Sequence, residues 1–125
     1  MSATAKPLVY VAEPISGDPF GCVRQSVDAS TALREMGCVP FCPQWSVVAE
    51  MVQHQPYEDW MAYDFDVIAR ADALVRLTGE SPGADREVVE AESLGIPVFG
   101  LEFGRDVQQI LAFVAEWHER RTVAR

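Results

Sequence analysis

Residues 73–101, ALVRLTGESPGADREVVEAESLGIPVFGL, contain the pattern that decides the fold. Two short apolar runs, Ala73–Leu77 and Pro97–Leu101, show no polar alternation, which is typical of strands covered on both faces. Between them lie a Ser/Pro/Gly loop and a helical pattern over 83–94 that stops at Gly95. The stretch therefore predicts a strand, a crossover helix and a second, parallel strand.

The rest of the chain repeats this alternation. Further strands are expected at Leu8–Ala12 and Cys38–Cys42, and further helices at 20–36, 57–71 and 105–120, with a short helical stretch between prolines in 43–56. Alternating strands and helices predict a doubly wound α/β domain, a three-layer sandwich around a four- or five-stranded parallel sheet. We expect one domain over 1–125. Ligands of such sheets bind beyond the carboxyl ends of the strands, which selects the loops at 13–19, 43–56 and 78–83.

Charge and composition exclude several classes of partner. The chain has 19 acidic and 10 basic residues and a net charge of −9, which argues against nucleic acid. Its N-terminus resembles neither a signal peptide nor a membrane span, so no membrane partner is expected. Cys22, Cys38 and Cys42 have no paired spacing, which favours a reducing, cytoplasmic location. The spacing of Cys38 and Cys42, with no His cluster, also predicts no metal, and no cofactor is expected.

Two acids fall on the apolar faces of their helices. At 100° per residue, Asp64 lies in the arc of Trp60, Val67 and Ile68, whereas Asp59 and Asp66 lie opposite. Glu87 lies between Leu94 and Ala91 by the same construction. A buried carboxylate is costly unless it finds partners or raises its pKa. Each acid alone has a structural explanation, but both can reach the same sheet edge, where paired carboxylates are a common basis for glycosidic-bond chemistry.

The loop before Glu87 has the residues of a helix start. Ser81 is a plausible N-cap, Pro82 a plausible first helical residue, and Gly83 permits close backbone approach. Free backbone N–H groups there can hold a hydroxyl or a phosphate oxygen. Taken alone, this motif favours an ordinary helix start.

Three segments resemble the nucleoside 2-deoxyribosyltransferase-like superfamily: YVAEPISGD at 10–18, YEDWMAYDFDVIARADALVRL at 57–77 and SPGADREVVEAESLGIPV at 81–98. The nearest resemblance is to its small uncharacterised bacterial and phage members. It implies a flavodoxin-like fold and an enzyme that acts on a small-molecule nucleoside or nucleotide. The implied activity is that of a nucleoside deoxyribosyltransferase or of a (deoxy)nucleoside or nucleotide N-glycosidase. Superfamily members are oligomers in which a neighbouring subunit completes the pocket, so a homo-oligomer is expected.

The resemblance also implies roles for individual residues. Glu87 matches the nucleophile that attacks C1′ and forms a glycosyl-enzyme intermediate, and Asp64 matches an acid that binds sugar hydroxyls and orients the nucleophile. Tyr10 matches a tyrosine that lies against both nucleophile and sugar. Ser81 occupies a position that is Asp in the transferases and Ser in the monophosphate glycosidases, and Gly83 follows it in the expected substrate-binding loop.

The first loop departs from the superfamily pattern. Glu13 stands where small residues, often Gly, are usual. Ser16 lies in the segment where the monophosphate glycosidases place a Ser and an Arg on the phosphate, but that Arg is missing here. An added acid and a missing Arg disfavour a phosphate, so Glu13 and Ser81 point to different substrates, and we give Glu13 more weight. This departure keeps a second hypothesis open, a non-catalytic nucleotide or nucleotide-derivative binding module on the same fold.

Overall fold

The computed structural model describes residues 5–14, 19–43, 45–101 and 105–123. These residues form four strands and five helices that alternate along the chain. In order they are β1 (Leu8–Ala12), α1 (Pro19–Glu35), β2 (Val39–Phe41), α2 (Trp45–Val52), α3 (Tyr57–Ile68), β3 (Ala73–Arg76), α4 (Pro82–Ser93), β4 (Val98–Phe99) and α5 (Arg105–Val123). Every strand lies where the sequence predicts one.

The four strands form one parallel sheet in the order β2-β1-β3-β4. Tyr10 of β1 is in register with Phe41 of β2 on one side and with Leu74 of β3 on the other. The chain therefore leaves β1 towards one edge of the sheet and later returns to place β3 on its other side. In a doubly wound sheet this reversal opens a crevice at the carboxyl ends of the two central strands.

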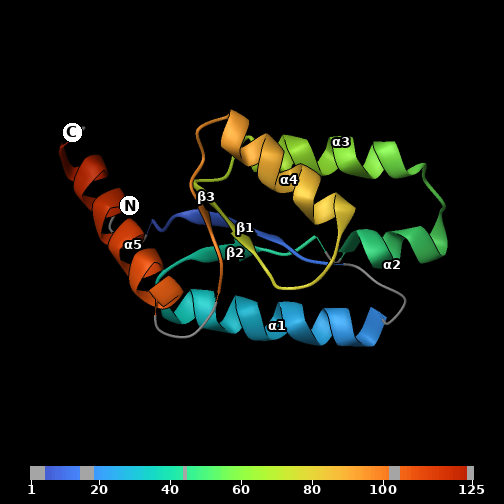
Figure 1. Ribbon diagram of the computed structural model, residues 1–125, viewed down its shortest axis with the longest axis horizontal. Helices are drawn as coiled ribbons and strands as arrows, with labels where there is room; N and C mark the ends of the chain where they lie inside the picture. Colours follow the sequence, from blue (N-terminus) through green and yellow to red (C-terminus); the bar gives the residue numbers. More distant parts are fainter. Residues whose placement is uncertain (1–4, 15–18, 44, 102–104, 124–125) are drawn as a thin grey trace.

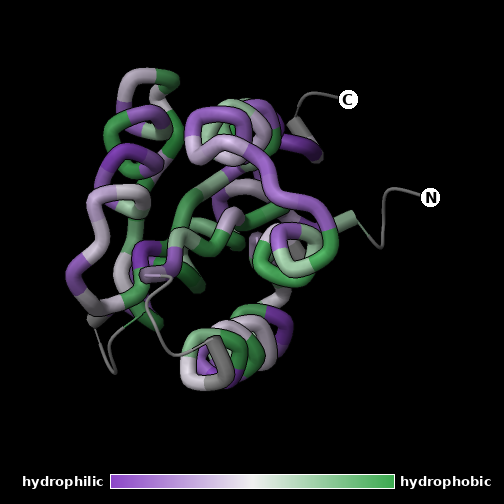
Figure 2. The backbone as a smooth tube through the Cα atoms, turned by 90° about the vertical axis from the view of Figure 1, so that its right-hand side faces the viewer, coloured by the Kyte–Doolittle hydropathy of each residue, from purple (hydrophilic) through white to green (hydrophobic). Residues whose placement is uncertain are grey.

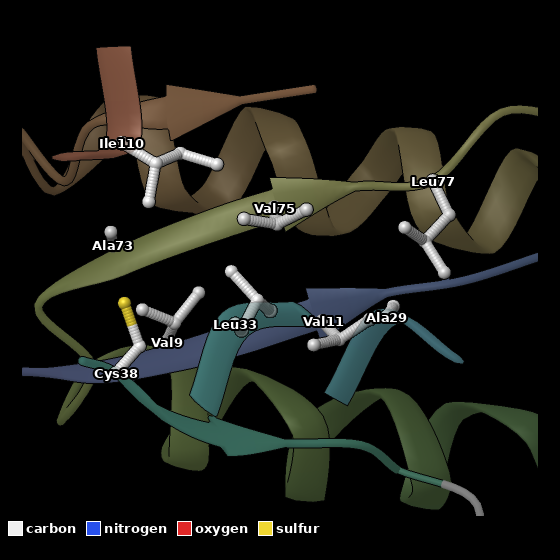
Figure 3. Close-up of a cluster of buried hydrophobic side chains, with 9 residues drawn as sticks. All are labelled: Val9, Val11, Ala29, Leu33, Cys38, Ala73, Val75, Leu77 and Ile110. Carbon is white, nitrogen blue, oxygen red and sulfur yellow. The ribbon is translucent and has the colours of Figure 1, made fainter. Parts of the chain in front are cut away.

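Helices cover both faces of the sheet, as Figure 1 shows: α3 and α4 pack on one face, and α1 and α5 on the other. Figure 3 shows the core under α1 and α5, where side chains such as Val9, Val75 and Leu33 meet Ile110. The opposite core holds Tyr10, Leu74 and Ile68. The expected flavodoxin-like three-layer α/β architecture is confirmed, with four strands in the described part of the chain.

The burial of both faces explains the absence of polar alternation in the strands. In β1, Val9 and Val11 pack towards α1 and α5, while Tyr10 and Ala12 pack towards α3 and α4. In Figure 2 the tube is mostly green near the middle of the molecule, whereas the helices around it carry both green and purple residues. No helix of the described residues is long and apolar enough to cross a membrane.

Some element boundaries differ from those predicted. The helix expected over 57–71 ends at Ile68, because the backbone N–H of Arg70 bonds to the carbonyl of Val67 and tightens the chain into a turn before β3. The short helical stretch expected within 43–56 is α2. The last helix runs to Val123, beyond the predicted end at 120.

Gly79 fixes how the β3–α4 loop meets the β1–α1 loop. Its φ of +136° is one that residues with a side chain rarely adopt, and a Cβ at this position would lie 2.7 Å from the ring of Pro14. Two loops at the carboxyl edge of the sheet are thus in direct contact. Their approach positions the residues that follow β1 and β3 around a shared space.

Candidate active site

A cavity of about 750 Å³ lies at the carboxyl edge of the sheet. Its walls come from the segments that follow β1, β2 and β3, and from α2, α3 and α4. The lining residues include Glu13, Pro43, Glu50, Trp60, Met61, Asp64, Ser81, Pro82, Gly83 and Glu87. The cavity thus lies at the sheet edge that the strand order predicts, and it draws on all three predicted loop regions.

The two inward acids and the tyrosine of β1 converge beside this cavity. Glu87 lies in the second turn of α4 and is 4% exposed, and the Tyr10 hydroxyl donates a hydrogen bond to its carboxyl group. Asp64 of α3 is 8% exposed and lies close enough to both Glu87 and Tyr10 to affect their pKa values. Helical periodicity predicted that both acids lie on the buried faces of their helices, and the packing of α3 against α4 brings them together.

Burial and mutual repulsion govern the charges of this cluster. Desolvation raises the pKa of Glu87 to about 8, and the neighbouring Asp64 adds to the rise, while Tyr10 and Arg76 oppose it. Desolvation also raises the pKa of Asp64. The pKa of Tyr10 is raised well above its usual value, so its phenol remains a hydrogen-bond donor. Since two close carboxyl groups cannot easily both ionise, the pair favours a state in which it holds one proton.

One oxygen of Asp64 has no hydrogen-bond partner. Among the described residues, Oδ1 of Asp64 is the buried side-chain oxygen that lacks one. A buried acceptor without a donor is costly, and such atoms in native structures call for an explanation. Because Asp64 lines the cavity, a bound hydroxyl or other donor is a natural partner for this oxygen.

Glu13 enters the cavity from the end of β1. It is 3% exposed and accepts a hydrogen bond of 2.6 Å from the hydroxyl of Ser26 on α1. The residue that departs from the superfamily pattern is therefore a buried acid in the wall of the same cavity. Ser16, expected to bind substrate beside it, lies outside the described residues.

The loop before α4 combines a helix cap with the cavity wall. Ser81 is the N-cap of α4, as predicted, and its Oγ accepts a hydrogen bond of 3.1 Å from the backbone N–H of Ala84. Gly83 lies so close to α3 that a Cβ there would be 3.0 Å from the hydroxyl oxygen of Tyr57. Ser81 thus caps α4 as in an ordinary helix start, and both Ser81 and Gly83 also line the cavity.

Glu50 is a cavity residue that the sequence did not reveal, and it is bonded to Trp60. The Glu50 carboxylate on α2 accepts hydrogen bonds from Nε1 of Trp60 at 2.6 Å and from the backbone N–H of Gln55 at 3.1 Å, and it contacts His54. These donors, Trp60 first, hold the pKa of Glu50 below its usual value. Trp60, which shares the apolar face of its helix with Val67 and Ile68, is half-buried in the cavity wall. The signal in the sequence was Glu50 itself, the single charged residue of the mostly apolar α2.

The arginines near the site are held by other groups. Arg86 does not line the cavity: it pairs with Glu58 at 2.9 Å and lies over the rings of Tyr57 and Phe65. Arg76 donates hydrogen bonds to the Leu77 and Gly79 carbonyls and to Asp85. None of the described residues that line the cavity is Lys, Arg or His. The described residues also contain no group of acids, Cys and His suited to a metal ion.

Comparison with known families places the chain. Residues 7–100 match the family described as Domain of unknown function (DUF4406). The chain belongs to this family. No curated protein matches it.

Solved structures show the same fold in two 2-deoxyribosyltransferases. The enzyme from the psychrotolerant bacterium Bacillus psychrosaccharolyticus is 23% identical, with a TM-score of 0.60, over 74% of this chain and 70% of its own. The enzyme from Leishmania mexicana is 16% identical, with a TM-score of 0.59, over 76% of this chain and 63% of its own, so this DUF4406 chain spans less than two thirds of that relative. The predicted resemblance to the nucleoside 2-deoxyribosyltransferase-like superfamily is confirmed at the level of the fold.

Proposed function

We propose that this DUF4406 protein cleaves or transfers the N-glycosidic bond of a small nucleoside or nucleotide-like molecule, with Glu87 as the nucleophile. The observation that carries the proposal is the buried Glu87 carboxyl beside a cavity, bonded by Tyr10 and paired with Asp64. The shared fold with 2-deoxyribosyltransferases supports the same chemistry.

The proposed reaction has two displacements at one carbon. An ionised Glu87 oxygen attacks C1′ of the sugar, the C1′–N bond breaks, and its electron pair leaves with the base, which takes up a proton when it would otherwise be an anion. The resulting ester between Glu87 and C1′ is then attacked by water or by a second base, which restores the carboxylate. A carboxylate nucleophile thus divides one difficult substitution into two easier steps.

The neighbours of Glu87 support this assignment. The Tyr10 hydroxyl holds the Glu87 carboxyl in one orientation from the centre of the sheet. The unpartnered Oδ1 of Asp64 is suited to accept a hydrogen bond from a sugar hydroxyl, and a satisfied acceptor would stabilise the bound substrate. We assign Glu13, Ser81 and Gly83 to the wall of the substrate site.

The proton on Glu87 must leave before the attack. A carboxyl group with its pKa raised to about 8 is largely protonated at neutral pH. Hence the rate of base release should rise with pH until Glu87 is ionised, unless the substrate itself favours the ionised form. Such a dependence would be a direct signature of the proposed nucleophile.

Chromatographic detection of free base tests the proposal. The protein is incubated with ribonucleosides, 2′-deoxynucleosides and their 5′-monophosphates, each with and without a second base as acceptor. We expect base release or exchange from at least one substrate, and loss of that activity in Glu87→Gln. The matched control is Glu92→Gln, which neutralises an exposed acid on the same helix. Base release that survives in Glu87→Gln would exclude this nucleophile.

The alternative is a binding module without catalysis, and the buried Glu13 and the protonated Glu87 favour it. The same panel separates the two functions. A binding module would retain a nucleoside measurably by calorimetry but release no base at any pH from 6 to 9, roughly the range in which Glu87 titrates. Catalysis would give base release that increases with enzyme concentration.

We also propose that the protein is a homo-oligomer. Besides Val89 of α4, the protein exposes apolar side chains on α2, beside the cavity: Val48 (61%), Met51 (81%) and Val52 (86%). A contiguous exposed apolar surface is typical of a contact site. Light scattering at several protein concentrations measures the mass, and a monomer at every concentration would contradict this expectation.

A further inference from the structure

The walls of the cavity carry an excess of negative charge. Glu13, Glu50, Asp64 and Glu87 all line it, and no described lining residue is basic. The sequence Ile-Ser-Gly-Asp at 15–18, in the first loop, adds no Lys or Arg. The two arginines nearest in sequence to the loop before α4, Arg76 and Arg86, are bonded to Asp85 and Glu58. The described lining thus holds four acids and no basic residue, while two groups outside it act on these acids: Arg76 lowers the pKa of Glu87, and the imidazole of His54 contacts Glu50.

A second observation points to a ligand. Asp64 lines the cavity, is only 8% exposed, and has an Oδ1 atom without a hydrogen-bond partner. A carboxylate oxygen in this position is stabilised by a donor or by positive charge. The acidic cavity thus also contains a hydrogen-bond acceptor, Oδ1 of Asp64, for which the described residues supply no donor.

The outer half of the cavity suits a flat ring. Trp60, Met61, Met51 and Val47 give it an apolar and aromatic wall, and the Glu50 carboxylate is held beside the Trp60 indole by the Nε1 hydrogen bond. The negative face of an aromatic ring and a nearby carboxylate both attract a cationic ring that has lost its water. A neutral ring would gain only the apolar contact.

Resting on the proposed function, we propose that the cavity takes positively charged N-glycosides: nucleosides whose sugar is bonded to a quaternary ring nitrogen and whose 5′-hydroxyl carries no phosphate. The cationic ring would lie against the Trp60 indole and beside the Glu50 carboxylate that is bonded to its edge, with the sugar hydroxyls towards Asp64. A 5′-phosphate would add negative charge to a cavity that already holds four acids.

The chemistry of such a substrate fits the residues present. When Glu87 attacks C1′ and the C1′–N bond breaks, the electron pair neutralises the cationic nitrogen, and the base leaves uncharged without a proton. The Glu50 carboxylate, whose pKa is lowered by its donors, is a poor source of a proton for a leaving base. Water then adds to C1′, and the products are the free sugar, the Glu87 carboxylate and one proton.

The charge of the substrate also affects the nucleophile. A positive charge close to Glu87 favours its ionised form, whereas a phosphate favours the protonated one. A cationic substrate would therefore release the proton that Glu87 holds in the free cavity. This links the recognition of the substrate to the activation of the nucleophile.

Binding measurements on matched ligand pairs test the inference. One pair is nicotinamide riboside and its reduced form, which has a similar shape but no charge; the other is 7-methyl-2′-deoxyguanosine and 2′-deoxyguanosine. Isothermal titration calorimetry at low salt uses the wild type, or Glu87→Gln where the wild type consumes the ligand. We expect the cationic member of at least one pair to bind about tenfold more tightly or better, and the 5′-monophosphate of nicotinamide riboside to bind more weakly than the nucleoside.

Two variants identify the source of the preference. Glu50→Gln keeps an acceptor for Trp60 but removes a charge from the cavity, and it should reduce the ratio of the two dissociation constants by about threefold or more. Glu92→Gln removes a charge from an exposed position and should leave the ratio unchanged. Equal affinities within both pairs, no detectable binding of either cationic nucleoside, or tighter binding of the monophosphate would each overturn the inference.

Failure of the proposed ligand class and failure of the proposed catalysis would give different results. Binding that prefers the cation without any base release would refute the catalytic proposal and keep the ligand class. Base release from neutral nucleosides that depends on Glu87 and shows no cationic preference would keep the catalytic proposal and refute the ligand class.

Discussion

The hydroxyl of Tyr10 on β1 donates a hydrogen bond to the carboxyl group of Glu87 on α4. Tyr10 is fully buried, and its ring stacks on Phe41 of β2 with centroids 5.8 Å apart. The centre of the sheet thus fixes the orientation of an acid that is 77 residues away along the chain. A group held by the rigid part of the fold is better placed for chemistry than one held by a loop.

Tyr10→Phe should weaken Glu87 as a nucleophile without unfolding the protein. The substitution keeps the ring and its stacking but removes the donor that lowers the pKa of Glu87. We expect base release at pH 7 to fall by about 10- to 100-fold, and the rising limb of kcat/KM against pH to move to higher pH. An unchanged pH profile would show that the hydroxyl does not act on the nucleophile.

Glu87→Gln should change how stability depends on pH. The pKa of Glu87 is about 8 in the folded protein and its ordinary value is 4.5, so the folded state binds the proton more tightly. The free energy of unfolding of the wild type should therefore fall as the pH rises from 4.5 to 8. At pH 9 the variant should be more stable than the wild type by about 1–3 kcal/mol.

Urea denaturation at several pH values measures this difference. Asp64 contributes a slope of the same sign, because its pKa is also raised, so the variant should show a smaller slope and not a flat line. The control Glu92→Gln should keep the slope of the wild type. Identical slopes in wild type and Glu87→Gln would mean that Glu87 has no raised pKa.

Gly79→Ala should destabilise the fold through the contact between two loops. The substitution costs the strain of a positive φ and a clash with the Pro14 ring, in total about 2 kcal/mol or more. Gly95→Ala is the matched control, since Gly95 also has a positive φ but open space around it. Thermal unfolding should show the greater loss for Gly79→Ala, and equal losses would contradict the loop contact.

Ser81→Ala separates the cap of α4 from substrate binding. Loss of the bond from the Ala84 N–H to Oγ should lower the free energy of unfolding by about 1 kcal/mol. Ser93→Ala removes a hydroxyl that bonds to a carbonyl at the other end of α4 and should cost less. If Ser81 only caps the helix, the KM for the substrate should be unchanged in Ser81→Ala.

The sequence predicted the positions of the four strands along the chain and the two inward acids, because both follow from the pattern of apolar residues. Asp64 and Glu87 lie on apolar faces at 100° per residue, and the structure buries both. The periodicity could not say that the two acids touch, since that depends on how α3 packs against α4. The same holds for Tyr10, whose partner on α4 is determined by the tertiary fold.

The outer wall of the cavity, formed by Glu50 and Trp60, could not be predicted from the sequence. Glu50 lies on a short helix between prolines, and its importance depends on the Trp60 indole reaching it from α3. Trp60 has the spacing of a core residue, yet the cavity opens at this point and leaves it half-buried. Periodicity identifies the apolar face of a helix, but it does not show where that face borders a cavity and not packed side chains.

The central claim is that Glu87 forms a covalent bond to the sugar, and mass spectrometry of a trapped intermediate tests it most directly. The protein is quenched in acid during turnover and digested with trypsin, which cleaves after Arg86 and Arg105 and releases a peptide that begins with Glu87. We predict this peptide with the added mass of the sugar, fragmentation that places the sugar on Glu87, and no adduct in Glu87→Gln. Turnover with no adduct on this peptide and full activity in Glu87→Gln would contradict the claim.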